Sequence, residues 1–167
     1  MDIYADVVIV GTGVGGLFAA LNIEPHKKVV LITKSDMESS DSFLAQGGIS
    51  ALKNPEDYDS YFEDTMKAGH YENDKGAVEK MIKESPQIIQ DLKDFGVRFD
   101  LKDGEIEFTR EGGHSTFRIL HHEDLTGKEI TSHLYEEAKK RDNITIMENC
   151  TMIDIIEKDG ECKGIVY

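Results

Sequence analysis

Short apolar runs and amphipathic stretches alternate along the first part of the chain. Residues 6–10 and 28–33 are almost unbroken runs of Val, Leu and Ile, which is typical of strands buried on both faces of a parallel sheet. Residues 17–23 between them are mostly apolar and predict a helix that Pro25 ends. The pattern therefore predicts a strand–helix–strand unit with a right-handed crossover.

The next segment differs in character. Residues 35–50 are polar and contain glycine, which indicates a long functional loop or a discontinuous helix. Aromatic and apolar residues at helical spacing then run to Gly69, with Asn54 as the expected N-cap and Pro55 at the first helical position. The acidic pair Glu56-Asp57 at the start of this helix predicts a solvated face.

Two more helices are predicted farther along the chain. One covers residues 77–95, with an interruption near Pro86, because proline removes a helix hydrogen bond and crowds the preceding turn. The other opens at Thr126–Glu129, which has the spacing of a capping box, and runs to about Lys140.

The C-terminal part predicts strands. Residues 144–147 are a third apolar run, expected to join the parallel sheet. Residues 151–157 and 161–167 are expected to pair as an antiparallel hairpin around the turn at 158–160. Because the chain ends inside an apolar strand, we expect it to be part of a longer protein.

Composition narrows the function classes. With 33 acidic residues against 19 Lys and Arg, the formal net charge is −14, which argues against nucleic acid or an anionic membrane as a partner. The apolar runs are too short for a membrane span. The low number of cysteines, two in all, fits a reduced, cytoplasmic protein. The expected hairpin register places Cys162 near Glu157 and away from Cys150. We therefore expect no disulfide between the two cysteines.

The strongest motif is a G-x-G-x-x-G pattern between the first strand and the first helix, formed by Gly11, Thr12, Gly13, Val14, Gly15 and Gly16. Such a turn lets a pyrophosphate approach the backbone at a helix N-terminus, although the same glycines also suit a purely structural tight turn. An acid that would hold a ribose is missing at the end of the second strand, where Lys34 stands. Local reasoning leaves NAD, NADP and FAD open.

Four motifs together identify a resemblance: residues 11–16, Thr33-Lys34, Ala45–Ile49 (AQGGI) and Arg110–Ser115 (REGGHS). This set resembles the L-aspartate oxidase family of the succinate dehydrogenase and fumarate reductase flavoprotein superfamily. The resemblance covers essentially all 167 residues but only the N-terminal part of a family member. It implies an α/β, Rossmann-like FAD-binding domain of the glutathione-reductase type, incomplete over residues 1–167, with the capping and C-terminal domains absent.

The resemblance also implies which residues line the flavin nucleotide. Besides the residues of the glycine-rich turn, these are Lys34, Asp41, Ser42, Phe43, Leu44, Ala45, Gln46, Gly47 and Gly48, with Thr151 and Met152 on the adenine side. The alternative for residues 45–48 is a plain tight loop. Covalent members of the superfamily carry a histidine where Ser40-Asp41-Ser42 stands, so noncovalent FAD is expected. A carboxylate at Asp41 would repel a diphosphate unless it points to solvent.

For the substrate, the resemblance places Glu111 beside the amine of aspartate; the alternative is a solvated acid on a glycine loop. His114 and Ser115 belong to the same motif, and the alternative for them is that they only hold the loop. The pair His121-His122 suggests a metal, but adjacent side chains diverge and no further ligands are suitably spaced, so we expect no metal site.

The implied activity is FAD-dependent oxidation of L-aspartate to iminoaspartate, the first step of quinolinate and NAD synthesis, with oxygen or fumarate as electron acceptor and a functional link to quinolinate synthase. The family's remaining catalytic residues would lie beyond Tyr167, so this chain alone should be inactive. The alternatives are a soluble fumarate reductase-type flavoprotein, which the Arg110–Ser115 loop argues against, and a non-catalytic dinucleotide-binding module.

Overall fold

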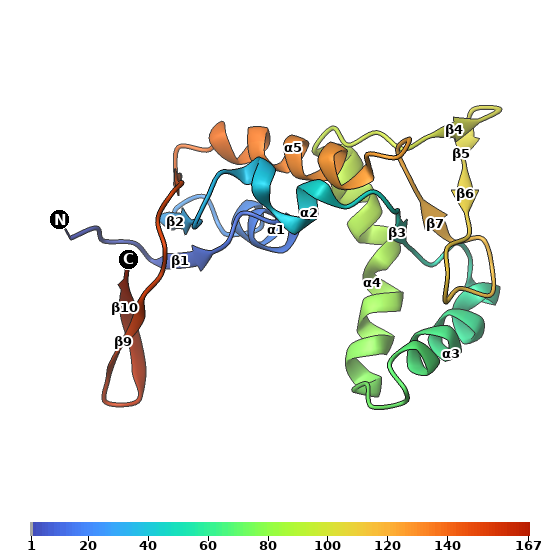
Figure 1. Ribbon diagram of the computed structural model, residues 1–167, viewed down its shortest axis with the longest axis horizontal. Helices are drawn as coiled ribbons and strands as arrows, with labels where there is room; N and C mark the ends of the chain where they lie inside the picture. Colours follow the sequence, from blue (N-terminus) through green and yellow to red (C-terminus); the bar gives the residue numbers. More distant parts are fainter. Residues whose placement is uncertain (1) are drawn as a thin grey trace. The chain divides into compact units, whose positions relative to one another are not determined.

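The computed structural model describes residues 2–167, which form two units (Figure 1). The first unit combines the N-terminal residues through Ala45 with Ile130–Tyr167, and the second is Gln46–Glu129. The chain therefore belongs to the first unit up to Ala45, forms the second unit, and re-enters the first unit at Ile130.

The first unit contains a three-stranded parallel sheet in the order β1-β2-β8. The strands are β1 (Val7–Val10), β2 (Val29–Ile32) and β8 (Ile144–Met147). All four residues of the central strand are buried, which explains its unbroken apolar run. Helix α1 (Val14–Leu21) follows β1 and buries Leu17, Ala20 and Leu21. The predicted parallel strands and the helix between the first two are confirmed.

Residues 37–44 form a discontinuous helix, one of the two forms expected for this segment. The 3₁₀ turn η1 (Met37–Ser39) is capped by Asp36, whose carboxylate accepts from Ser39 N at 2.8 Å. A separate short helix, α2 (Asp41–Leu44), is capped by Ser40, whose hydroxyl accepts from Phe43 N at 3.2 Å. The two caps fix the bend between these pieces.

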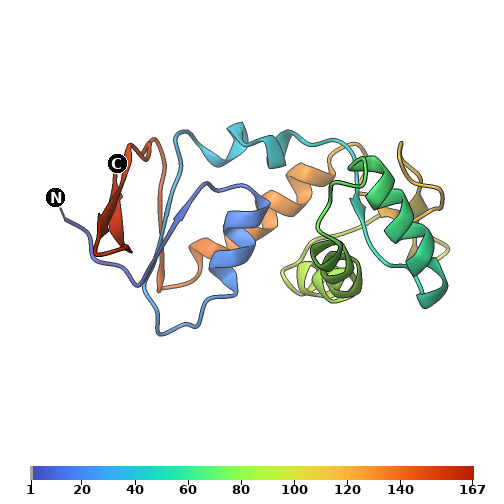
Figure 2. The same ribbon diagram turned by 90° about the horizontal axis from the view of Figure 1, so that it is seen from below.

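The C-terminal residues form a two-stranded antiparallel ribbon of β9 (Asp154–Lys158) and β10 (Glu161–Val166) (Figures 1 and 2). Asp159 and Gly160 at its tip have φ of 58° and 77°, the positive values that a tight two-residue hairpin turn requires. Cys162 lies opposite Glu157, and both cysteines are free.

The second unit is built on two helices that lie side by side, α3 (Tyr58–Ala68) and α4 (Lys75–Asp94) (Figure 2). Their shared core contains Tyr61, Met66, Val78 and Ile82. The 3₁₀ turn η2 (Pro55–Asp57) leads into α3, and Asn54 Oδ1 accepts from Asp57 N at 3.1 Å, which confirms Asn54 as a cap.

The predicted interruption of α4 near Pro86 is wrong, because the helix is continuous through that residue. Proline cannot supply the N–H that would bond to the carbonyl oxygen of Ile82. The hydroxyl of Ser85 donates to this oxygen instead, at 2.7 Å, and accepts from Leu52 N at 2.8 Å. A neighbouring side chain thus replaces the missing backbone donor.

A small antiparallel sheet in the order β3-β7-β6 completes the second unit, with a separate hairpin of β4 (Leu101–Lys102) and β5 (Glu105–Ile106). The sheet comprises β3 (Ile49–Ser50), β6 (Phe108–Thr109) and β7 (Ile119–Leu120). Because β6 and β7 pair, the sheet anchors both ends of the loop over residues 110–118.

Helix α5 (Thr126–Lys139) passes from the second unit into the first. The predicted capping box at its start is wrong: Glu129 N bonds to Leu125 O at 2.9 Å, so the helical bonds begin before Thr126. The Thr126 hydroxyl instead accepts from His122 N at 3.0 Å. None of the helices within residues 2–167 combines the length and apolar character that a membrane span needs.

Candidate functional site: a glycine-rich turn and an acid-lined pocket

The glycine-rich turn of the first unit is tightly packed against its own backbone. Gly11 has φ of 107°, in the region that favours glycine, and its N–H bonds to Ile32 O at 2.7 Å. A Cβ added at Gly16 would lie 2.0 Å from Gly11 O, so α1 can start this close to β1 only with glycine there. Around Gly15, by contrast, an added Cβ would meet no atom within 4 Å.

The structure brings this turn together with part of the predicted nucleotide-binding segment. Val14 N donates to the hydroxyl of Ser42 at 3.1 Å, and a Cβ on Gly13 would lie 2.8 Å from the same oxygen. Asp41 beside it is exposed, so its carboxylate has access to solvent. The other predicted residues of this unit, Lys34, Phe43, Leu44, Ala45, Thr151 and Met152, lie at the surface or are partly buried.

The start of α1 suits an anion. Its N-cap residue, Gly13, provides no side-chain cap, and the first turn contains no acidic residue. Free N–H groups and the positive end of the helix dipole attract negative charge at such a position. The hydroxyl of Thr12 is buried and has no hydrogen-bond partner within residues 2–167. An open backbone at Gly15, a helix start whose own N-cap residue provides no side-chain cap, and an unpartnered hydroxyl together fit a bound diphosphate.

The second unit contains a pocket of about 350 Å³ that unites two motifs far apart in the sequence. Gln46, Gly47 and Gly48 line it together with Glu111. A Cβ on Gly48 would lie 2.2 Å from the Ile119 side chain and 2.3 Å from Leu120 O, so glycine is needed for this segment to lie against β7. Three residues predicted to line the flavin nucleotide and the predicted substrate residue therefore share one cavity.

The other residues of this pocket were not singled out from the sequence as substrate-site residues. They are Thr109, His121, Glu123 and Asp124. Together with Glu111, three carboxylates and one imidazole therefore surround the space. His121 is about one-fifth exposed, and its Nδ1 lies 3.2 Å from Asp100 Oδ2. Anionic groups in a concave site favour a cationic group on the ligand.

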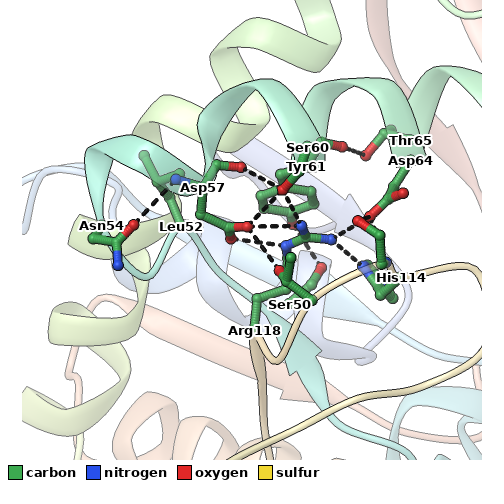
Figure 3. Close-up of polar contacts among 12 residues, drawn as sticks. Ser50, Leu52, Asn54, Asp57, Ser60, Tyr61, Asp64, Thr65, His114 and Arg118 are labelled. Atoms are coloured by element: carbon green, nitrogen blue, oxygen red, sulfur yellow. Dashed lines mark hydrogen bonds and ion pairs between the residues drawn. The ribbon is translucent and has the colours of Figure 1, made fainter.

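Next to the pocket loop, Arg118 forms the centre of a buried ion cluster (Figure 3). Its side chain is completely buried, and its guanidinium lies 4.8 Å from the centre of the Tyr61 ring. Nε and Nη2 each donate to the Asp57 carboxylate at 2.8 Å, and Nη1 donates to Asp64 Oδ2 at 2.6 Å. Ser60 Oγ accepts a further bond from Nη2 at 2.7 Å.

His114 and Ser115 belong to this cluster, and neither lines the pocket that contains Glu111. Ser115 donates from both N and Oγ to Asp64 Oδ2, at 2.7 and 2.8 Å. The Nη1 group of Arg118 lies 3.0 Å from His114 Nδ1; since a guanidinium only donates, Nδ1 accepts. Burial first, and then the Arg118 charge, lower the pKa of His114, so the neutral ring is favoured.

The expectation of a solvated face at Glu56-Asp57 is wrong for Asp57. Only 9% of its side chain is exposed. Hydrogen bonds from Arg118 lower the pKa of Asp57 to about 2, and those from Ser60 and Thr116 add to this effect. The sequence contains a signal that could have indicated the pair: Arg118 is the single charged residue in a short stretch before the buried strand β7.

A larger hollow of about 570 Å³ lies in the first unit, lined by the N-terminal segment, by parts of β1 and β2, and by β10. None of the predicted site residues lines it. The smaller pocket around Glu111 is therefore the better candidate for chemistry.

Comparison with known proteins decides the family. A family model described as FAD binding domain matches residues 6–167. The chain belongs to this FAD-binding family. FAD is accordingly its cofactor, which removes the alternatives NAD and NADP that the glycine-rich turn left open.

Curated relatives of this FAD-binding chain include L-aspartate oxidases from two clostridia. The Clostridium acetobutylicum protein is 46% identical over 165 residues, and the Clostridium perfringens protein is 41% identical over 163 residues. Each alignment covers 98% of this chain but only 38% and 37% of the relative. The chain thus spans little more than a third of the length of these relatives.

Solved structures show the same α/β flavoprotein fold. A quinol fumarate reductase chain from E. coli matches with a TM-score of 0.91 and 27% identity, over 99% of this chain and 29% of that one. A chain of the Mycobacterium smegmatis Sdh1 complex matches with a TM-score of 0.86 and 30% identity, over 96% of this chain and 30% of that one.

Proposed function

We propose that this chain is the N-terminal FAD-binding part of an L-aspartate oxidase, with a domain of the glutathione-reductase type that continues beyond residue 167. The whole enzyme would oxidise L-aspartate to iminoaspartate for quinolinate and NAD synthesis, with fumarate or oxygen as electron acceptor. The observation that carries the proposal is the shared pocket of Gln46, Gly47, Gly48 and Glu111. The aspartate oxidase relatives support the same substrate.

Each unit, taken by itself, contains residues suited to part of FAD. In the first, the start of α1 and the Thr12 hydroxyl would hold the diphosphate, with Ser42 fixing the turn through Val14 N. In the second, the backbone of residues 46–48 would approach the flavin ring. Bound FAD supplies a two-electron acceptor; the protein contributes orientation, charge and exclusion of water.

Glu111 would select an amine-bearing substrate. Aspartate carries two carboxylates and an ammonium, and a carboxylate on the enzyme can accept a charge-assisted hydrogen bond from that ammonium. Fumarate and succinate lack this group. The loop that presents Glu111 would be held in place by Ser115 and His114 through the Arg118 cluster, so we assign these two a positioning role.

The test is Glu111→Gln in the full-length enzyme, with aspartate oxidation and fumarate reduction measured side by side. Loss of the charge-assisted bond, about 1.5–3 kcal/mol, corresponds to roughly 10- to 150-fold in kcat/KM for aspartate. Fumarate reduction should change little. Equal losses in both reactions, with FAD content unchanged, would show that Glu111 is structural.

The flavin of the full-length enzyme should be noncovalent, because residues 40–42 contain no histidine. Acid precipitation should leave the yellow colour in the supernatant. Flavin that stays on the precipitated protein would contradict this part of the proposal.

A fumarate reductase is the second candidate, because the E. coli quinol fumarate reductase has the same fold. The same pair of assays separates the two. An enzyme that reduces fumarate and has no activity on aspartate would favour the reductase and overturn the proposal.

A further inference from the structure

His121 is the one imidazole that lines the acid-lined pocket, and its Nδ1 lies 3.2 Å from Asp100 Oδ2. The two residues are tied through their backbones, because Asp100 N donates to His121 O at 2.8 Å. Asp100 is itself fixed: its Oδ2 accepts from Glu123 N at 2.8 Å, and its carbonyl accepts from Glu107 N at 2.9 Å. The imidazole therefore belongs to a residue that lines the cavity, and its carboxylate partner is itself held in place.

The position of Asp100 favours one tautomer of His121. A carboxylate oxygen can only accept, so Asp100 Oδ2, 3.2 Å from Nδ1, favours a proton on Nδ1. In the neutral ring the lone pair then lies on Nε2. No hydrogen bond to Nε2 is found within residues 2–167, which leaves that nitrogen able to accept a proton.

The proposed reaction needs a proton acceptor at the amine. Aspartate carries an ammonium at neutral pH, and an ammonium has no lone pair. The C=N bond of the imine can form as hydride leaves Cα only after the nitrogen has lost a proton. Glu111 would bind the ammonium, but a carboxylate is ordinarily a much weaker base than an imidazole.

We propose that His121 is this base, an inference that rests on the proposed function. An N–H bond of the substrate ammonium breaks, a bond between that proton and Nε2 forms, and the electron pair stays on the substrate nitrogen. His121 becomes an imidazolium that the Asp100 carboxylate stabilises, and it later returns the proton to water. Glu111, Glu123 and Asp124, which line the same pocket, add to this stabilisation.

The structure offers a matched control in His122. Its Nδ1 lies 3.4 Å from the other oxygen of Asp100, and its Nε2 lies 3.8 Å from Glu129, yet it does not line the pocket. His121→Gln and His122→Gln therefore remove neighbouring imidazoles beside the same carboxylate. Only the first should remove the base.

The experiment uses the full-length, FAD-loaded enzyme and measures aspartate oxidation against pH, fumarate reduction and FAD content. His121→Gln should lower kcat for aspartate about 100-fold or more near neutral pH, the usual effect of a general base. The loss should shrink in alkaline solution, where free amine is already present. Fumarate reduction should be kept, and His122→Gln should behave like the unchanged enzyme.

A loss that is the same at every pH, or equal for aspartate and fumarate, or absent, would overturn the inference. If His121→Gln does not retain FAD, Asp100→Asn is the second variant, because the amide oxygen can still accept from Glu123 N. It should lower kcat for aspartate much more than fumarate reduction, since the imidazolium loses its anion; losses that are equal in the two reactions, or absent, also overturn the inference. An unchanged enzyme inactive on aspartate would instead refute the proposed function itself.

Discussion

Arg118 and Asp57 are joined at two points, from Nε to Oδ2 and from Nη2 to Oδ1, each at 2.8 Å, although 61 positions separate them in the sequence. This paired geometry is the strongest form of a carboxylate–guanidinium contact. It connects the end of the Glu111 loop to the start of α3. The shape of the pocket wall therefore depends on an ion pair that does not itself line the pocket.

Asp57→Asn should destabilise the protein. The substitution leaves the fully buried Arg118 with one carboxylate partner, Asp64, in place of two, so we expect a loss below the cost of about 3–5 kcal/mol that is typical when a buried charge is left without any partner. Urea-induced unfolding would measure the loss. Glu56→Gln, at the exposed neighbouring position, is the control and should have little effect. Equal stabilities of the two variants would contradict the assigned role of the pair.

The free energy of unfolding should fall in acid because the Asp57 carboxylate becomes protonated. The pKa of Asp57 is lowered from 3.8 to about 2, so the folded state binds this proton less readily than the unfolded state. The ionised Asp57 carboxylate contributes about 2 kcal/mol to the free energy of unfolding. This contribution is complete above about pH 4 and is lost as the pH falls towards 2. Unfolding free energies measured across this range should fall more steeply for the unchanged protein than for Asp57→Asn. Parallel curves would refute the assignment.

Ser85→Ala should destabilise α4 in a way that a second change can reverse in part. The variant leaves Leu52 N and Ile82 O without the hydroxyl that serves both, a loss of about 1–3 kcal/mol. In the double variant with Pro86→Ala, the new N–H at position 86 can bond to Ile82 O. Thermal unfolding of both variants would test this; no recovery in the double variant would show that the Ser85–Ile82 bond contributes little.

The neighbouring glycines 15 and 16 should respond differently to alanine. Gly16→Ala forces a Cβ against Gly11 O and should destabilise the protein even without FAD. Gly15→Ala meets no atom of the chain and should leave the apoprotein stable, but weaken FAD binding if a diphosphate approaches there. Thermal unfolding of the apoprotein and FAD titration separate the two effects. Normal FAD affinity in Gly15→Ala would place the diphosphate elsewhere.

The amino-acid pattern alone predicted the parallel strands, the turn between the first strand and α1, and the cap at Asn54. These features arise from contacts close in the chain, or from burial on both faces of a strand, which leaves an unbroken apolar run. The resemblance to the aspartate oxidases further selected Gln46, Gly47, Gly48 and Glu111, which the structure places around one pocket.

The partners of individual polar side chains became known only from the folded chain. Asp57 has the composition of a solvated helix start, yet it is buried because Arg118 reaches it from a distant loop. Pro86 is tolerated inside α4 because a hydroxyl one position away points back at Ile82. His121 meets Asp100, 21 positions earlier in the sequence, through the backbone bond from Asp100 N to His121 O. Such contacts depend on where side chains meet in space, and they leave no periodic pattern in the sequence.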